Sequence, residues 1–356
     1  MVFAIPFILC ANEKRSTLSL SEYWKRHSFY IIPTASYSPE TDWSFGLAGS
    51  HYFKLPNSYH SSSVSYQADY SLLQQFRIHG NTRLYIQENN LIYCNLQIER
   101  YPEKYYGRGN QEAQLLNTPI QYIPWRVKLV VQPLWRLAPH WYIGPHLSIW
   151  MEKSSLNEET GLKSFFIWGP GFVLNFDNRD NVYYPTHGCF FKSSFYYSDP
   201  YLGSSARMLS WQNDLRGFIH LGKGVIIGGQ LVTNMVYGTS DIPVQILPCI
   251  GGSDLMRGIR YGIWRDNLAI SLQSELRFPI WKLLSGATFI SAGDVYNLYN
   301  WQWSLPKIGY GGGIRIQFND SKVNLRFDVA RENYGNWHNF ADINTWRFYF
   351  TATEAF

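Results

Sequence analysis

The sequence lacks long hydrophobic runs and is poor in charged residues. No stretch of its 356 residues approaches the roughly 18–20 uninterrupted apolar residues that a membrane-spanning helix needs, which excludes a bundle of such helices. Charged residues make up 16% of the chain, whereas soluble globular domains average about 25%. The chain therefore fits neither a helical membrane protein nor an ordinary soluble domain.

Cysteine is scarce, and sequence motifs for catalysis are missing. Cys10, Cys94, Cys189 and Cys249 are far apart and form no Cys-x-x-Cys pair, which argues against a zinc site or a redox pair. The sequence contains no Gly-x-Ser-x-Gly or His-Glu-x-x-His motif. We therefore assign no catalytic residue, metal or cofactor, and we expect that the chain is not an enzyme.

The positive charge is small and scattered. The net charge is +5, and the lysines and arginines form no basic helix or repeated basic stripe. Such a distribution does not favour a nucleic-acid partner.

Aromatic residues, in contrast, are abundant. They make up 17% of the chain, while the mean hydropathy is only −0.23. A transmembrane β-barrel has this composition, because its strands alternate between residues that face lipid and residues that face a wet interior. The composition thus favours a barrel, whose surroundings would be outer-membrane lipid.

The residue pattern predicts about sixteen strands and no sustained helical period. An even number is typical of single-chain bacterial barrels. The predicted strands are residues 28–38, 43–55, 61–70, 75–87, 90–101, 119–137, 141–153, 162–177, 187–199, 205–221, 224–237, 266–279, 282–295, 308–319, 322–331 and 345–356.

The lengths of the connections support the same fold. Long connections at 102–118, 154–161, 238–265, 296–307 and 332–344 mostly alternate with tight turns at 138–140, 222–223, 280–281 and 320–321. Long loops on one side of the membrane and short turns on the other are typical of outer-membrane barrels. We therefore predict an all-β chain that forms a transmembrane antiparallel β-barrel.

The two ends of the chain carry further expectations. Residues 1–27 form an N-terminal segment whose short apolar run suggests the remnant of a signal peptide, and residues 28–356 form the barrel. In the last predicted strand, Trp346, Phe348 and Phe350 share one face, which we expect to meet lipid. Phe356 is in phase with that face, and so is Glu354, which is awkward there unless it lies at the membrane boundary.

Several motifs resemble the BamA/TamA family of outer-membrane assembly and translocation barrels, also called the bacterial surface antigen superfamily. Residues 256–259, Met-Arg-Gly-Ile, match the Val-Arg-Gly-Phe-like element of that family and lie in the longest connection. Glu275 matches a glutamate on the following strand. Residues 177–181 (Asp-Asn-Arg-Asp-Asn), with Pro185 and Gly188, and residues 105–109 (Tyr-Tyr-Gly-Arg-Gly) match two further elements.

The resemblance implies a specific arrangement in the lumen. The 238–265 loop would fold into the barrel, and Arg257 would bind Glu275, with Gly258 allowing close backbone approach. The family has an aspartate where this chain has Ser291, and Asp294 lies on the opposite face by strand parity. We therefore expect one carboxylate to hold Arg257, since a serine offers only a hydroxyl.

The resemblance also implies a function in the bacterial cell outer membrane. We expect a role in protein insertion or translocation there. The match does not extend to periplasmic POTRA domains, so a periplasmic or outer-membrane partner protein would supply that part. A second interpretation is a pore or structural subunit of an outer-membrane complex without insertase activity. A third, an enzyme barrel, would need a convergent Ser/His/acid group at the outer rim.

Overall fold

The computed structural model describes residues 27–38, 42–55, 58, 61–86, 90–115, 119–154, 161–239, 242–317, 324–333, 346–352 and 354–356. The N-terminal segment 1–26, the predicted turn at 320–321 and most of the predicted connection 332–344 lie outside these residues. Within the described part of the chain, no helix is long and apolar enough to cross a membrane.

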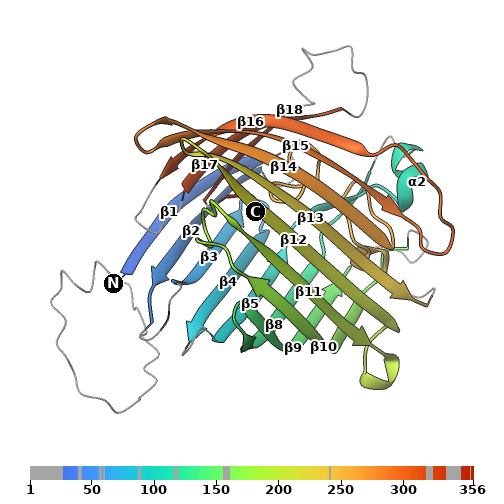
Figure 1. Ribbon diagram of the computed structural model, residues 1–356. Coiled ribbons are helices and arrows are strands. Elements are labelled where there is room, and N and C mark those ends of the chain that lie inside the picture. Colours follow the sequence, from blue (N-terminus) through green and yellow to red (C-terminus); the bar gives the residue numbers. More distant parts are fainter. Residues whose placement is uncertain are drawn as a thin grey trace, which may run out of the picture.

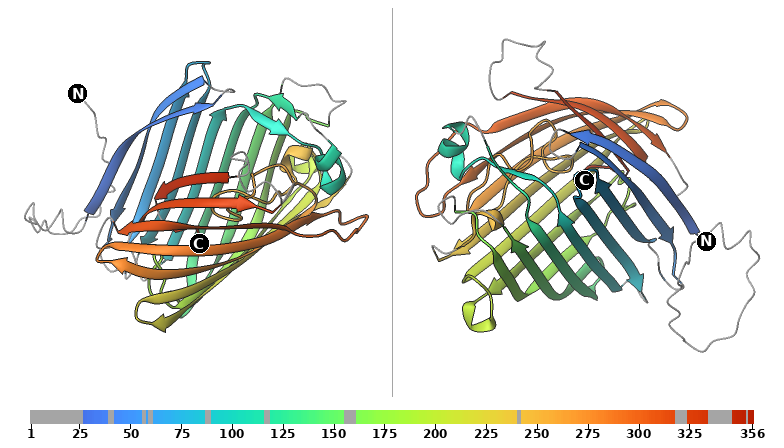
Figure 2. Two further views of the ribbon diagram at one scale, coloured as in Figure 1. Left: turned by 90° about the horizontal axis from the view of Figure 1, so that it is seen from above. Right: turned by 180° about the vertical axis from the view of Figure 1, so that it is seen from behind.

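Sixteen strands form one antiparallel sheet in which each strand pairs with its neighbour in the chain, apart from a short excursion after β5. Figures 1 and 2 show the sheet curving around on itself into a barrel. The first eight strands of the sheet are β1 (His27–Ser38), β2 (Asp42–Phe53), β3 (Ser62–Ser71), β4 (Phe76–Ile86), β5 (Asn90–Arg100), β8 (Trp125–Ala138), β9 (Trp141–Lys153) and β10 (Phe165–Asp177). The others are β11 (Gly188–Ser198), β12 (Met208–Gly222), β13 (Val225–Gly238), β14 (Leu268–Trp281), β15 (Leu284–Tyr296), β16 (Lys307–Gln317), β17 (Asn324–Glu332) and β18 (Trp346–Ala352).

The predicted all-β fold and all sixteen predicted strands are confirmed, with shifts at their ends. One shift moves a tight turn. β14 continues to Trp281, so the chain reverses at Lys282, which has a φ of 43°, and not at the predicted 280–281.

The last strand is shorter than predicted. β18 ends at Ala352, and residues 354–356 are not in a strand. The expectation that Glu354 and Phe356 face lipid is wrong, because both side chains are buried.

Some of the long connections contain short strands, a short helix or 3-10 turns. The connection between β5 and β8 holds a two-stranded sheet of β6 (Glu103–Tyr105) and β7 (Ile120–Tyr122), with the helix α2 (Gly109–Leu115) between them. Short 3-10 turns occur at Pro200–Leu202 and Val244–Ile246. Figure 1 shows α2 at the end of the barrel opposite the β12–β13 and β14–β15 turns, as the alternation of long and short connections requires.

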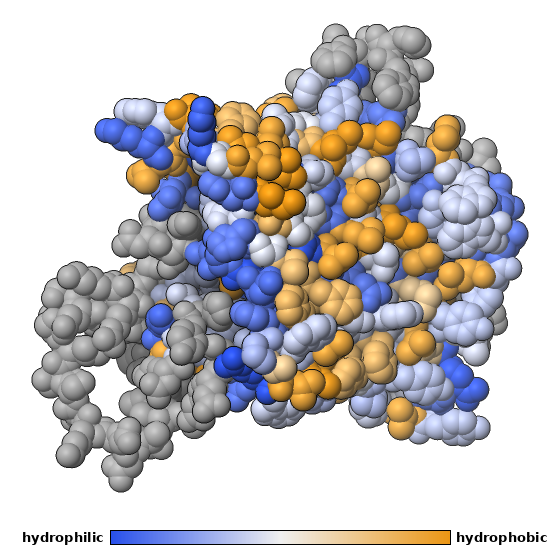
Figure 3. All heavy atoms as spheres, viewed as in Figure 1, coloured by the Kyte–Doolittle hydropathy of each residue, from blue (hydrophilic) through white to orange (hydrophobic). Residues whose placement is uncertain are grey.

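The two faces of the wall differ in chemistry. Along β14, Leu272 and Leu276 are exposed on the outside, whereas Gln273, Glu275 and Arg277 are buried on the inside. Apolar side chains gather on the outer face of the wall shown in Figure 3, and hydrophilic residues lie toward the ends of the strands. This alternation gives an outer surface that matches lipid and a polar lumen.

Candidate functional site: a buried charge cluster in the lumen

Strands β14, β16 and β17 place charged side chains on the inner face of the wall. Because side chains alternate along a strand, residues two apart point to the same side. Together with one residue of the β13–β14 connection and one near the end of the chain, they form a group of seven buried residues, here called the lumen cluster: Arg257, Arg277, Arg315, Arg326, Glu275, Asp328 and Glu354.

Arg257 lies at the centre of the lumen cluster. Its Nη1 is 2.5 Å from Glu275 Oε2 and 2.8 Å from Asp328 Oδ2, and all three side chains are fully buried. Its guanidinium lies 3.6 Å above the centre of the Phe289 ring. The charge-assisted contacts and the cation–π contact hold the β13–β14 connection, residues 239–267, against the wall.

Two glycines let the loop backbone reach the wall. Gly258 has a φ of 99°, and a Cβ atom there would lie 2.6 Å from Arg331 O. A Cβ atom on Gly309 of β16 would lie 2.2 Å from Arg257 O. Any larger residue at either position would separate the loop from the wall, so the close approach that we inferred for Gly258 holds and extends to Gly309.

Ser291 faces the lumen, as its strand parity predicts, but it does not leave Arg257 with a single carboxylate. Its hydroxyl donates to Gly309 O at 3.2 Å. The expectation of one carboxylate is wrong, because Asp328 of β17 supplies the second. Sequence comparison along β15 missed this residue, since it comes from a strand two positions away in the sheet.

Other members of the lumen cluster extend the network across four elements. Arg315 of β16 contacts Glu275 at 3.1 Å, Asp328 at 2.5 Å and Glu354 at 2.9 Å. Arg277 contacts Glu275 at 2.7 Å, and Arg326 contacts Asp328 at 3.4 Å. The alternation of charged and apolar residues on β16 and β17 was the sequence feature that could have indicated these residues.

The last described residues lie inside the lumen and do not extend the wall. Glu354 accepts hydrogen bonds from Arg315 and from Asn324, and Phe356 stacks on Phe218 of β12 with 5.9 Å between ring centres. Arg277 Nη2 donates to Phe356 O at 3.2 Å. This segment, Glu354–Phe356, therefore joins β16 and β17 to β12 and β14.

Apolar packing holds the rest of the loop. Ile250, Met256 and Ile259 are fully buried in one cluster with Trp264 and with Ala113 of α2. A salt bridge of 3.0 Å between Arg108 and Asp266 joins the connection that carries α2 to the same loop. The predicted motif at 105–109 thus belongs to the segment around α2 that packs against the β13–β14 connection.

The second predicted motif, at 177–188, forms the connection between β10 and β11. Arg179 binds Asp177 with two hydrogen bonds of 2.9 and 2.8 Å. Asp180 accepts hydrogen bonds from the Thr186 and His187 amides, and Gly188 has a φ of 100°. This connection lies at the end of the barrel opposite α2.

Among the described residues no cluster of His, Cys, Asp and Glu could hold a metal ion.

Comparison with known proteins gives three findings. A family model described as the Omp85 superfamily domain matches residues 12–356. No curated protein matches the sequence.

Solved structures with the same fold include "The crystal structure of BamA from Haemophilus ducreyi lacking POTRA domains 1-3", with a TM-score of 0.58 and 14% identity over 92% of this chain and 70% of that chain. They also include CdiB from Acinetobacter baumannii, with a TM-score of 0.55 and 12% identity over 94% of this chain and 68% of that chain.

Proposed function

This chain belongs to the Omp85 superfamily, and on that premise we propose that it inserts or translocates proteins at the bacterial outer membrane, working along its wall and not through an open lumen. One observation carries the second part of the proposal. Arg257 is fully buried between two carboxylates and holds the β13–β14 connection inside the barrel. Removing one partner of such a pair strands a buried charge, so the loop favours its place in the lumen.

The wall offers the alternative route for a substrate. The sheet runs from β1 to β18, and among the described residues no backbone pairing joins these two strands, so each is an edge at the junction between the two ends of the sheet. A client strand could pair with an edge there, because an edge strand presents unpaired backbone groups. We propose that this junction is where the chain acts on client proteins. A periplasmic or outer-membrane partner would deliver them.

The second candidate function is a pore or a structural subunit. It is favoured by the polar lumen, which contains two cavities of about 530 and 550 Å³. A pore function would require the loop to leave the lumen or to leave a continuous path beside it. We propose no enzymatic activity, because the seven buried charges of the lumen cluster pair with one another.

Reconstitution distinguishes the two functions. Liposomes that contain the purified protein should accelerate the folding of a urea-denatured client barrel, compared with empty liposomes and with liposomes that contain an unrelated barrel. In planar bilayers the same protein should conduct poorly, and Arg257→Ala should conduct more. Large stable conductance of the unchanged protein, without acceleration of client folding, would support the pore and contradict our proposal.

Purification from native membranes tests the partner. A periplasmic or outer-membrane protein should co-purify with the chain after mild detergent extraction. Recovery of the chain with lipid alone would argue against a stable assembly.

A further inference from the structure

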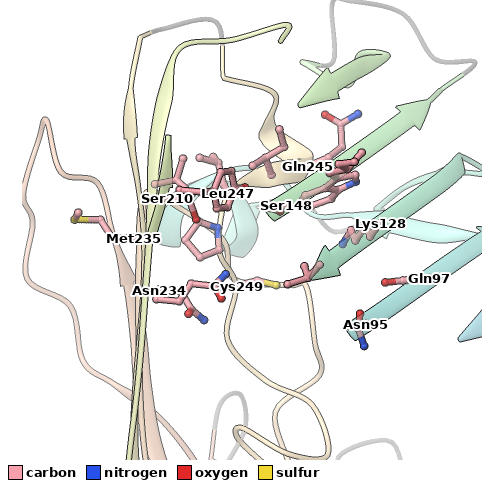
Figure 4. A pocket seen from close by; sticks show the side chains of 18 of the residues that line it. Asn95, Gln97, Lys128, Ser148, Ser210, Asn234, Met235, Gln245, Leu247 and Cys249 are labelled. Atoms are coloured by element: carbon pink, nitrogen blue, oxygen red, sulfur yellow. The ribbon is translucent and has the colours of Figure 1, made fainter. Parts of the chain in front are cut away.

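A second site lies in the lumen, away from the lumen cluster. It is a cavity of about 530 Å³ between the inner faces of β5, β8, β9, β11, β12 and β13 and the β13–β14 connection. Figure 4 shows Asn95, Gln97 and Lys128 on one side of the cavity, Ser210 and Asn234 on the other, and Leu247 and Cys249 of the connection between them. We call it the lumen cavity. Its volume lies within the range of about 300–1,000 Å³ typical of small-molecule sites.

Buried polar atoms around the lumen cavity lack hydrogen-bond partners among the described residues. They are Gln132 Oε1, His146 Nε2, Trp150 Nε1, Gln245 Oε1 and Arg265 Nε. All of these side chains except Trp150 are more than nine-tenths buried. Buried polar groups are almost always hydrogen-bonded to protein or to ordered water, so five such atoms in side chains that line one cavity indicate that a polar molecule, water or a ligand, completes their hydrogen bonding.

The lumen cavity also has an excess of positive charge. Its lining includes four cationic side chains and a single carboxylate, that of Glu103. Glu103 is already bound to Arg126 through both oxygens.

Two lysines in the lining make no ion pair with a described residue. Lys128 Nζ lies 3.5 Å from the centre of the Trp150 ring, and Lys192 Nζ lies 4.5 Å from that of Tyr93. The aromatic rings orient the two ammonium groups without neutralising them, so each could still bind an anionic group.

The unpartnered atoms define the ligand further. Gln132 Nε2 lies 2.8 Å from His146 Nδ1, and with Gln132 as the donor the imidazole proton is on Nε2. His146, Trp150 and Arg265 then offer donors, whereas Gln132 and Gln245 offer acceptor oxygens. A matching ligand has an anionic group for the lysines and both acceptors and hydroxyl donors for the remaining atoms.

We propose that the lumen cavity binds a small acidic polyol, a sugar acid or a sugar phosphate. The ligand would also contact the β13–β14 connection, because Gln245, Cys249 and Arg265 line the cavity. Binding would therefore stabilise the loop in the lumen, since a ligand that binds one arrangement shifts the population toward it.

The experiment uses the full chain in detergent with Cys10, Cys94 and Cys189 replaced by serine, so that Cys249 is the one remaining thiol. Calorimetric titrations with glucuronic acid, glucose 6-phosphate, glucose and inorganic phosphate separate charge from hydroxyl recognition. Labelling of Cys249 with a maleimide reports whether a bound molecule occupies the cavity. We expect at least one of the two acidic sugars to bind at millimolar concentration and to slow labelling, and to do so more strongly than glucose or phosphate. Their difference identifies carboxylate or phosphate as the preferred anion.

Lysine variants test the contacts. Lys128→Met and Lys192→Met should each weaken binding of the acidic sugar roughly ten- to a hundred-fold, and Lys128→Arg should retain more of it. Lys153→Met is the matched control, because Lys153 is exposed at the end of β9. Heat-dependent gel migration verifies that each variant folds.

Four results would overturn the proposal. Equal binding of glucose and the acidic sugars would show that the anionic group does not contribute to binding. Binding of inorganic phosphate as strong as that of the acidic sugars would show that the sugar hydroxyls are not recognised. Absence of any protection of Cys249, or unchanged binding in both Met variants, would place the interaction elsewhere.

Discussion

Arg257 makes strong contacts, but some of its hydrogen-bond donors are not used among the described residues. Its Nη1 contacts two carboxylates, while Nε and Nη2 have no hydrogen-bond partner among the described residues. The Phe289 ring beneath the guanidinium compensates in part for these missing bonds. The residue thus depends on two acids and one ring, each from a different strand of the wall.

Replacement of Arg257 by Ala should release the loop. Glu275 and Asp328 would keep Arg315 as a partner, so we expect a loss of about 3 kcal/mol, the lower end of the range for breaking a buried ion pair. Limited proteolysis in detergent should cut the variant faster within residues 239–267. Arg260→Ala is the control, because Arg260 is exposed in the same loop and contacts only the Tyr106 hydroxyl among the hydrogen bonds found. Equal protease resistance of the two variants would show that Arg257 does not hold the loop.

The second carboxylate that binds Arg257, that of Asp328 on β17, should be replaceable by a carboxylate on β15. Asp328→Asn should destabilise the loop, and adding Ser291→Asp to it should restore part of the loss, because a carboxylate on β15 would replace the one on β17. In the otherwise unchanged protein, Ser291→Asp should give little benefit, since Asp328 already occupies that role and another buried carboxylate costs desolvation. A double-mutant cycle of thermal unfolding measures the coupling, with Ser291→Ala as the control for the lost hydroxyl. Strict additivity would show that residue 291 is out of reach of Arg257.

At the scale of elements, the short last strand changes the chemistry of the lumen. β18 ends at Ala352, and Glu354–Phe356 lie inside the barrel against β12, β14 and β16. The segment brings the third carboxylate to four arginines. Its position is explained by charge, because Glu354 on the lipid face would be unpaired in hydrocarbon, whereas in the lumen it binds Arg315.

Fluorescence quenching tests this placement. A fluorophore attached through Phe356→Cys should be protected from brominated lipids, while one attached through Phe350→Cys should be strongly quenched. Phe350 is the matched control because it is exposed on the outer face of β18. Equal quenching at both positions would mean that the end of the chain lies against lipid.

At the scale of the whole molecule, the structure is a wall around a plugged interior. The outer face is apolar, and the inner face carries ion pairs that join β14 to β17 with the β13–β14 connection and Glu354. Pairing of β1 with β18 would leave no unpaired edge in lipid, which is the condition for a β-structure to span a membrane.

The folded protein should therefore show heat-dependent migration in mild detergent gels. The unheated barrel should migrate faster than the boiled chain, because a compact barrel resists the detergent. The Arg257→Ala variant should retain this behaviour but lose it at a lower temperature, since the loop braces the wall. A water-soluble monomer that needs no detergent would contradict the membrane assignment.

Much of the fold could be predicted from the sequence, because local alternation determines it. Many of the strands show a period of two, and most of the tight turns fall close to where that period breaks, so neither depends on distant residues. The same reasoning placed Ser291 on the lumen face and Arg257 in the longest connection. The sequence also showed that Glu354 was awkward on a lipid-facing strand unless it lay at the membrane boundary.

Tertiary structure alone decided how the charges pair. Asp328 and Arg315 are far from Arg257 in the sequence, and the curvature of the sheet brings them together with it. Glu354 meets Arg315 because the chain leaves the wall after β18, which no strand period can indicate. A buried charge needs an opposite charge within reach, because an unpaired one is strongly destabilising, and the curvature of the sheet determines what is within reach. The sequence therefore determined which residues face the lumen, and the tertiary structure decided which of them hold the loop.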